Sequence, residues 1–367
     1  MILSRLLLAD FRNIAEADLS FSSGMNVLYG QNAQGKTNVL EAVMVCATGR
    51  SHRTRLDSQL VQFEKREAHI RAFVDRRQRI DKIDVHIKKE EKKGVAVNGV
   101  SVRRSGELFG TLHTVLFSPE DLQLMKQGPA ERRRFLDLEL CQLSRVYYHN
   151  LQQYYKVLKQ RNRLLKSMQK QRNLKATLDV WDEQLEQYAS QVIRSRSSFT
   201  ETLSAIAHGL HDGITDGREE LVIQYRPNCG AEELRKKWKQ NLDKDILYGN
   251  TSHGPHKDDL LFLVNGNDVK LYGSQGQQRT AALSAKLAEI TLIQQEAREK
   301  PILLLDDVLS ELDDQRQKDL VETIHGVQTI LTCTGVEGPV EPFAARARIF
   351  HVKQGKILLE KSENVSF

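Results

Sequence analysis

Short apolar runs with alternating polar positions fill the first third of the chain. Alternation of this kind over four to eight residues is typical of strands, and Asn-Gly between two such runs predicts a two-residue hairpin turn, here at Asn98-Gly99. A helix is predicted over Asn38–Ala47. The expected strands are Ile2–Phe11, Ala17–Ser20, a buried strand ending at Tyr29, Ala68–Val74, Ile80–Ile87, the two halves of Val95–Val102, and His113–Phe117.

The pattern changes to a helical period near Glu120. After Pro129 no proline follows as far as Leu210. Two series of apolar residues recur at the spacing of one helix face. They are Tyr147, Leu151, Tyr154 and Leu158, then Leu178, Trp181, Leu185, Tyr188 and Val192. The polar, basic stretch from Lys166 to Lys175 between them predicts a helical hairpin with aromatic residues on its inner face.

The last third returns to short strands separated by helices. Strands are predicted at Leu221–Tyr225, Leu260–Val264, Asp268–Leu271, Ile302–Leu305, Thr329–Cys333, Ile349–Val352 and Ile357–Leu359, and helices at Ala231–Asp243 and Gln278–Glu299. The hairpin turns are expected at Asn265-Gly266 and Gln354-Gly355. We therefore expect an α/β chain in three stretches: a mixed-sheet part (1–119), a helical lobe without a long coiled coil (120–245), and a part that completes the first (246–367).

Composition narrows the class of protein. The 367 residues include 54 Lys and Arg against 48 Asp and Glu, a net charge of +6, which permits nucleic-acid binding without requiring it. The four cysteines form no metal-binding pattern, as is usual for buried thiols in a reducing compartment. The N-terminus lacks the features of a signal peptide, and no apolar run reaches the ~18 residues that span a bilayer. A cytoplasmic protein is expected.

A phosphate-binding loop follows the strand that ends at Tyr29. Gly30 to Thr37 fits G-x-x-x-x-G-K-[ST], in which backbone N–H groups surround phosphate oxygens at a helix N-terminus. Lys36 would reach the β- and γ-phosphates of ATP, and the Thr37 hydroxyl would ligate Mg²⁺. The alternative is a chance glycine-rich turn. The expected nucleotide-binding residues here are Gly30, Gln31, Asn32, Ala33, Gln34, Gly35, Lys36 and Thr37, of which Ala33 replaces a glycine common in such loops.

Two adjacent acids end the apolar run at Ile302–Leu305. Asp306 is the expected Walker B ligand of Mg²⁺, and Asp307 the expected general base that polarises the attacking water. The catalytic residues are thus Asp307 and Lys36, and the metal ligands Thr37 and Asp306. Thr37 and Asp306 lie 269 positions apart, too far for a compact kinase or small GTPase. The helical lobe accounts for the insertion.

A third motif opens the predicted long helix. Ser274, Gln275, Gly276 and Gln277 resemble the L-S-G-G-Q signature of ATP-binding-cassette ATPases, and Ser310 to Asp313 resemble their D-loop. In that superfamily the signature helix of one subunit caps the γ-phosphate held by the other, again an anion at a helix N-terminus. The alternative is a polar helix cap with no ligand.

Together these motifs resemble the RecF family, bacterial recombination and repair ATPases related to SMC proteins. About 90 helical residues are inserted here, without the long heptad run of SMC coiled coils. The resemblance rests on the phosphate loop and on Phe11-Arg12-Asn13, Gly49 to Thr54, Phe117 to Leu122, Arg132 to Asp137, His253 to Asp259, Tyr272 to Arg279 and Leu305 to Asp307.

The resemblance implies an ABC-type, SMC-head-like P-loop ATPase lobe with a helical second lobe. It implies ATP-dependent homodimerisation, binding of single-stranded, gapped or duplex DNA, and loading of the recombinase with RecR and RecO as partners. Arg12 and Asn13 would lie near the nucleotide. Asp307 is shorter than the usual Glu, and Thr332-Cys333-Thr334 stand where transporter-type relatives carry a histidine, so we expect slow, weak, DNA-dependent hydrolysis.

Three questions stay open in the sequence. The segment with His253 and His256 carries too few ligands for a metal site, and a structural or interface role is favoured. A scaffold that binds ATP without hydrolysis and, less favoured, a transporter ATPase subunit remain alternatives. Candidate DNA-binding cations are Arg50, Arg53, Arg55, Arg76, Arg77, Arg79, Lys88, Lys89, Lys92, Lys93, Arg103, Arg104 and the basic turn from Lys166 to Arg172.

Overall fold

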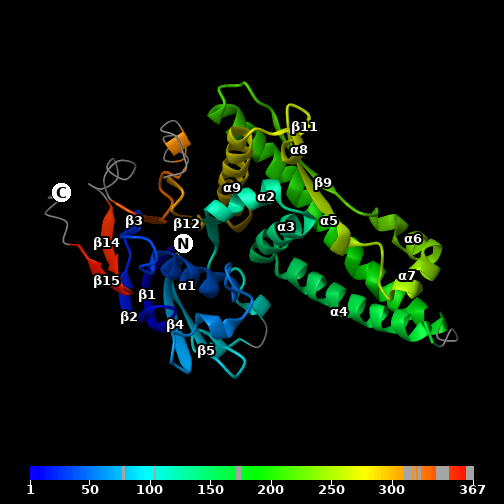
Figure 1. Cartoon of the computed structure of the whole chain (residues 1–367), viewed down its shortest axis with the longest axis horizontal. Helices are drawn as coiled ribbons and strands as arrows, with labels where there is room; N and C mark the ends of the chain where they lie inside the picture. Colours follow the sequence, from blue (N-terminus) through cyan, green and yellow to red (C-terminus); the bar gives the residue numbers. More distant parts are fainter. Residues whose placement is uncertain are drawn as a thin grey trace. The chain divides into compact units, whose positions relative to one another are not determined.

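The chain folds into two compact units, each described here by itself. One comprises Met1–Asp121 and Glu289–Phe367, and the other Leu122–Ala288. The sequence analysis divided the chain into three parts, at 119/120 and 245/246, by its motifs and not by compact units. That division remains a prediction. The computed structural model (Figure 1) describes residues 1–76, 79–102, 105–170, 175–309, 316–317, 320, 324–335 and 347–360.

The first unit contains a mainly parallel sheet with the order β15-β14-β3-β13-β12-β8. Every neighbouring pair is parallel except β14 with β15, so the carboxyl ends of β3, β13 and β12 meet at one edge. The buried pattern of β3 and β12 matches their apolar sequence, as expected of central parallel strands. The strands are β3 (Met25–Tyr29), β8 (Thr114–Phe117), β12 (Ile302–Asp306), β13 (Thr329–Cys333), β14 (Arg348–Lys353) and β15 (Lys356–Leu359).

The same unit contains an antiparallel sheet with the order β2-β1-β4-β5-β6-β7. Its strands alternate between buried and exposed residues, because one face packs inward and the other meets solvent. The strands are β1 (Ile2–Phe11), β2 (Ile14–Ser20), β4 (Glu67–Arg76), β5 (Arg79–Lys88), β6 (Gly94–Val97) and β7 (Val100–Ser101), and short 3-10 helices occupy Asp57–Leu60 and Ser105–Glu107.

Helix α1 (Lys36–Thr48) contacts strands of both sheets. Residues Val39 to Thr48 are all buried, so the helix has no polar face. Its first residues lie directly after β3, where the loop from Gly30 to Gly35 joins strand to helix. This arrangement places the phosphate-binding motif at the carboxyl edge of the parallel sheet, the usual ligand-binding edge of open α/β sheets.

The second unit is mostly helical. The predicted hairpin is present as α4 (Arg145–Met168) and α5 (Lys175–Ile214), with Tyr154, Leu158, Leu185 and Trp238 fully or nearly buried between them and α6. The strand order is β11-β10-β9. The other elements are η3 (Pro119–Leu122), α2 (Gln123–Lys126), α3 (Pro129–Leu143), β9 (Leu221–Arg226), η5 (Ala231–Glu233), α6 (Leu234–Gln240), α7 (Leu242–Tyr248), η6 (Pro255–Lys257), β10 (Asp259–Val264), β11 (Asn267–Asp268), α8 (Val269–Tyr272) and α9 (Gln275–Ala297). Both η3 and α9 cross a boundary between the units, since α9 continues past Ala288.

Several sequence-based boundaries were wrong, among them the start of β2, which begins at Ile14 rather than Ala17. Only Asp268 of the expected strand Asp268–Leu271 is extended; its side chain accepts a hydrogen bond from the Lys270 N–H at 2.8 Å and so starts helix α8. The expected helix Ala231–Asp243 is divided at Asn241 and resumes as α7 to Tyr248. Helix α9 begins at Gln275 rather than Gln278, because Ser274 caps it.

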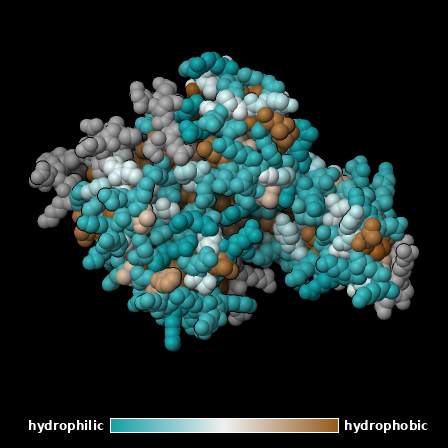
Figure 2. Space-filling view, in the orientation of Figure 1, coloured by the Kyte–Doolittle hydropathy of each residue, from teal (hydrophilic) through white to brown (hydrophobic). Residues whose placement is uncertain are grey.

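None of the helices within the described ranges is both long and apolar enough to cross a bilayer. On the face shown in Figure 2, hydrophilic side chains predominate and hydrophobic ones form small separate groups. Scattered groups of this kind are normal on folded proteins.

Candidate functional site

The phosphate loop is held in place by its neighbours in the parallel sheet. The Gly30 N–H donates to the Cys333 carbonyl at 3.3 Å, and Gly30 has φ of 151°. A Cβ at Gly30 would lie 2.2 Å from the Val352 carbonyl oxygen, so only glycine fits between β3 and β14. Gly35, with φ of 115°, makes the turn into α1. Ala33 has φ of 63°, which glycine adopts more readily and which explains why related loops carry glycine there.

Lys36 lies inside this loop. Its Nζ donates to the Gly30 carbonyl at 2.6 Å and to the Gln31 carbonyl at 2.9 Å, and the residue is 6% exposed. Burial lowers the pKa of the Lys36 ammonium, and the nearby Asp307, Cys333 and Asp306 oppose that shift. The predicted loop residues therefore surround an ammonium group whose local countercharge comes from the Walker B acids.

The two halves of the predicted metal site meet directly. The Thr37 hydroxyl donates to Asp306 Oδ1 at 2.9 Å, although the residues are 269 positions apart. The Thr332 hydroxyl donates to the same Oδ1 at 2.8 Å. Asp306 is opposite Thr332 in the parallel register of β12 and β13, which explains the contact. An alcohol and a carboxylate at one point form the hard oxygen donor set that Mg²⁺ prefers.

Asp307 follows the strand with its backbone in the left-handed region, at φ of 55°. Its N–H donates to the Thr332 hydroxyl oxygen at 3.0 Å. One hydroxyl therefore positions both acids: it binds the Asp306 carboxylate and fixes the turn that redirects the chain at Asp307. Sequence reasoning noted Thr332 only as the replacement of a histidine and missed this role.

Arg12 and Asn13 lie against the same loop and helix, as the family resemblance implied. The Asn13 amide donates to the Gln34 carbonyl at 3.0 Å and accepts from the Asn38 amide at 2.8 Å. Arg12 makes a bidentate pair with Glu41 of α1, at 2.8 and 2.6 Å. Both residues are thus fixed beside the nucleotide loop.

Glu41 is a residue of this site that the sequence analysis missed. It is fully buried in α1 and also accepts from the Ser51 hydroxyl at 2.5 Å. Burial alone would raise the pKa of Glu41, but the hydrogen bonds from Arg12 and Ser51 outweigh it and hold that pKa below its usual value. A buried acid in a helix directly after a phosphate loop was the available signal, since such a charge needs a cationic partner.

The turn between β14 and β15 completes the loop's surroundings. The Gly355 N–H donates to the Gln34 carbonyl at 2.9 Å, and the Gln354 N–H donates to Gln34 Oε1 at 2.6 Å. The sequence predicted this turn but gave no sign that it would contact residues 320 positions earlier.

The signature residues are in the second unit, at the start of α9. The Gln277 N–H donates to Ser274 Oγ at 3.2 Å, and Gln277 Oε1 accepts from the Ser274 N–H at 3.0 Å. This reciprocal pair is a capping box. It leaves the serine and Gln275 exposed at the helix N-terminus, while Gly276 is half-buried.

A buried polar chain supports this cap. Gln277 Nε2 donates to Glu219 Oε1 at 3.1 Å, Glu219 Oε2 lies 3.3 Å from His211 Nε2, and His211 Nδ1 lies 3.0 Å from Ser284 Oγ. His211 is fully buried in α5, and Ser284 is one helical turn further along α9 than Thr280. The chain therefore joins the signature residue to both long helices.

The segment from His253 to Asp259 is held by ion pairs and hydrogen bonds within its own unit. Arg132 makes a bidentate pair with Asp259 at 2.6 and 2.9 Å, and the buried Arg196 contacts Asp258 at 3.0 Å. Both nitrogens of His256 are hydrogen-bonded, Nδ1 to the Tyr154 hydroxyl at 2.5 Å and Nε2 to the Thr251 carbonyl at 2.9 Å. Both ring nitrogens of His256 therefore already have protein partners, and the motif joins α3, α5 and β10.

Other predicted residues are less informative. Ser310 to Asp313, Arg77, Arg103, Arg104 and Arg172 lie outside the described residues. Among the candidate DNA contacts, several form ion pairs within their own unit. These are Arg53 with Glu41, Arg76 with Glu299, Arg79 with Asp81, Lys88 with Glu91 and Lys93 with Asp57.

The fold defines the class of ABC-type ATPase heads, to which SMC heads belong. Its features are a mainly parallel sheet with a phosphate loop and Walker B acids at one edge, an added antiparallel sheet and an inserted helical hairpin. The chain matches the model of the RecF/RecN/SMC N-terminal domain over residues 2–357. The Smc head domain of Pyrococcus furiosus has the same fold, with a TM-score of 0.57 at 14% identity over 98% of this chain and 96% of that one.

The specific family follows from closer relatives. A DNA replication and repair protein RecF from Lachnoclostridium phytofermentans is 50% identical over 357 residues, 97% of this chain and 99% of the relative. A solved structure described as the recombination mediator protein RecF with ATP has a TM-score of 0.91 at 35% identity, covering 98% of this chain and 97% of that one. The chain belongs to the RecF family.

Proposed function

We propose that this protein is an ATP-dependent DNA-binding protein of recombinational repair and replication, whose ATP-bound homodimer clamps DNA and whose slow hydrolysis releases it. The observation that carries the proposal is the contact of Thr37 with Asp306 at 2.9 Å beside the buried Lys36. It supports the proposal because it joins phosphate loop and Walker B acid into one site for ATP and Mg²⁺. The relatives' description as DNA replication and repair proteins supports the cellular role.

Each residue around the nucleotide has a separate role in this proposal. Lys36 and the loop N–H groups bind the phosphates, and Arg12 and Asn13 buttress the loop from the side. Thr37 and Asp306 hold Mg²⁺, with Thr332 fixing the carboxylate. Asp307 accepts a proton from the attacking water as general base. ATP with its metal supplies the phosphoanhydride bond whose cleavage ends the clamped state.

The signature residues act in trans in this proposal. Ser274, Gln275, Gly276 and Gln277 of one subunit face the γ-phosphate that the other subunit holds, and the exposed α9 N-terminus supplies the favourable dipole. Ser274 is exposed, so a nucleotide held by another subunit can reach it.

Sedimentation of the full chain with and without ATP and Mg²⁺ tests the clamp. ATP is expected to raise the dimer fraction, and Ser274→Arg to abolish the rise while leaving ATP binding by the monomer intact. Ser198→Arg, at an exposed position of α5, is the matched control and keeps the rise. An equal monomer fraction with and without ATP contradicts the proposal.

DNA binding is tested by its dependence on salt. Affinity for gapped and duplex DNA should be higher with ATP and should fall steeply as salt rises, because phosphate contacts release counterions. RecR, with RecO as a further candidate, is the proposed partner, and the cytoplasm is the proposed location. Affinity that is independent of both ATP and salt would exclude a DNA clamp and favour a nucleotide-binding scaffold.

A further inference from the structure

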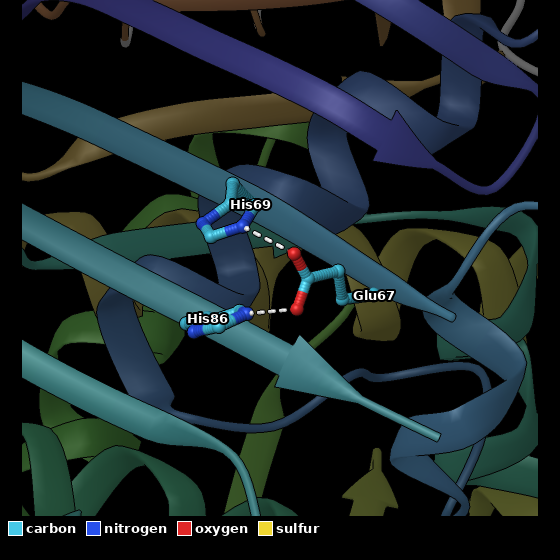
Figure 3. A group of neighbouring side chains, drawn as sticks. All are labelled: Glu67, His69 and His86. Carbon is cyan, nitrogen blue, oxygen red and sulfur yellow. Dashed lines mark hydrogen bonds and ion pairs between the residues drawn. The ribbon is translucent and has the colours of Figure 1, made fainter. Parts of the chain in front are cut away.

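Two histidines and a glutamate converge on the exposed face of the antiparallel sheet (Figure 3). Glu67 and His69 come from β4, and His86 comes from β5. The Glu67 carboxylate lies beside both rings, with Oε2 at 2.9 Å from His86 Nε2 and Oε1 at 3.7 Å from His69 Nε2. One nitrogen from each ring therefore faces the same carboxylate.

The strand geometry makes this convergence a property of the backbone. Glu67 and His69 are two positions apart and so point to the same face of β4. His69 is directly opposite His86 in the antiparallel register, and the rings stack with centroids 4.0 Å apart. A cross-strand pair of this kind holds two imidazoles side by side without any loop to position them.

The surroundings leave the cluster open to solvent. In the same row across the sheet, Ala9 of β1 is opposite His69 and Gly94 of β6 is opposite His86, so a small residue lies on each side. These four residues line one shallow groove. The side chains of His69 and His86 are 53% and 37% exposed. A small solute can reach all three groups.

The nearest cations on this face have carboxylate partners of their own. Lys88, opposite Glu67, contacts Glu91 at 2.9 Å, and Arg71 contacts Asp84 at 2.5 Å. The Glu67 carboxylate makes its ion pairs with the two histidines, and the nearby Lys88 adds a weaker electrostatic attraction. A plain exposed ion pair is the alternative, and such pairs add little to stability.

We propose that Glu67, His69 and His86 form a binding site for Zn²⁺. Two imidazole nitrogens and one carboxylate oxygen are the protein ligands of open zinc sites, in which water takes the fourth position. The candidate ligand atoms lie within 4.8 Å of one another. Bonds of about 2.0–2.2 Å need them roughly 3.3 Å apart, which rotation of exposed side chains provides. The nitrogen ligands disfavour Mg²⁺ and Ca²⁺.

The ion would join β4 to β5 on the face opposite α1, away from the nucleotide loop. Binding to the folded chain alone raises its stability in proportion to the logarithm of the zinc concentration. The site therefore predicts a measurable effect that does not depend on ATP.

The test is zinc binding by the full chain after treatment with a chelator. In a competition titration with a chromophoric chelator, the wild type should bind one equivalent more than His69→Ala, His86→Ala or the double variant. Glu67→Gln should lower the affinity for that equivalent of zinc by at least tenfold. His208→Ala, which removes an exposed histidine from α5, is the control and should bind as the wild type does.

Thermal unfolding gives an independent readout. Zinc chloride should raise the melting temperature of the wild type and of His208→Ala, but not that of the double variant, whose ATP binding shows that it folds. Zinc bound with the same stoichiometry by wild type and double variant, as would occur at the cysteines, overturns the proposal. So does the absence of zinc binding by the wild type.

Discussion

At the scale of single residues, the backbone conformation of Asp307 decides how its role can be tested. Asn tolerates the left-handed region as well as Asp, so Asp307→Asn should fold normally at φ of 55°. It removes the proposed general base, and phosphate release should fall by about 100-fold or more. ATP affinity should stay close to that of the wild type.

The matched measurements are phosphate release at saturating ATP and equilibrium binding of ATP. Unchanged release by Asp307→Asn would remove this carboxylate from the mechanism. If the wild type itself releases no phosphate, the ATP-binding scaffold becomes the better account of the site.

Thr332 offers a second test at this scale. Thr332→Val keeps the shape of the side chain but removes its bonds to Asp306 and to the Asp307 N–H. The affinity for ATP with Mg²⁺ should fall about tenfold, or ~1.4 kcal/mol, because the carboxylate of Asp306, the proposed metal ligand, loses a hydrogen bond that fixes it.

A control is available on the same strand. Thr329 is equally buried in β13, and its hydroxyl donates to the Val327 carbonyl at 3.2 Å. Thr329→Val should lower stability without changing ATP affinity. Equal losses of affinity in the two variants would mean that Thr332 acts through the fold alone.

At the scale of elements, the β14–β15 turn connects the C-terminal hairpin to the nucleotide loop. A Cβ at Gly355 would lie 2.1 Å from the Asn13 carbonyl oxygen. Gly355→Ala should therefore displace the turn from Gln34 and lower both stability and ATP affinity.

Gly266 provides the comparison, since it has φ of 77° against 75° for Gly355 and nothing near its Cβ position. Gly266→Ala should cost only the conformational penalty of about 1–2 kcal/mol and leave ATP affinity unchanged. Urea unfolding and ATP titration of both variants separate the two effects. Similar results for the two glycines would show that the contact with Asn13 is unimportant.

The comparison of sequence with structure shows which signals were local. Asn98-Gly99, Asn265-Gly266 and Gln354-Gly355 were predicted as turns and are turns, because the turn residues themselves set the conformation. The strand expected through Leu271 was wrong because Asp268 caps a helix, its carboxylate accepting a hydrogen bond from the Lys270 N–H.

The site was predictable where a motif carries it. Lys36, Thr37 and Asp306 were expected together and are together. Two site residues were missed. Thr332 contacts Asp306 because of the register of β12 and β13, and Gln354 contacts Gln34 because a hairpin packs against residues 320 positions earlier. Pairing over such a distance leaves no mark on the local sequence.

At the scale of the whole molecule, each unit contains a buried neutral histidine that makes stability sensitive to acid. Burial lowers the pKa of His113 and of His256 to about 4. His113 Nδ1 is buried without a hydrogen bond to any described residue, and His256 is bonded at both nitrogens. Neither environment accepts an added proton.

The direction of the pH effect on stability follows from the protonation of these histidines in the folded and unfolded chain. Above the ordinary pKa of 6.5 the histidines are neutral whether the chain is folded or not. Between that value and about 4 the unfolded chain binds protons that the folded chain refuses, so stability falls as pH falls. The loss is on the order of 3 kcal/mol for each group.

Urea unfolding at pH 7, 6 and 5 checks this, with His113→Gln as the variant. Its unfolding free energy should be lower at pH 7 and should change less with pH than that of the wild type. If the unfolding free energies of His113→Gln and the wild type change with pH to the same extent, the acid sensitivity belongs to other groups.

The position of β3 between β13 and β14 has a consequence for synthesis of the protein. The strand that leads into the nucleotide loop leaves the ribosome about 300 residues before either neighbour does. At a translation rate of ~5–20 residues per second, Val27 and Leu28, which are buried in the folded chain, lack their neighbouring strands for on the order of tens of seconds. During that interval the nascent chain exposes an unpaired apolar strand, and the nucleotide loop gains its supporting strands only once β13 and β14 have been translated.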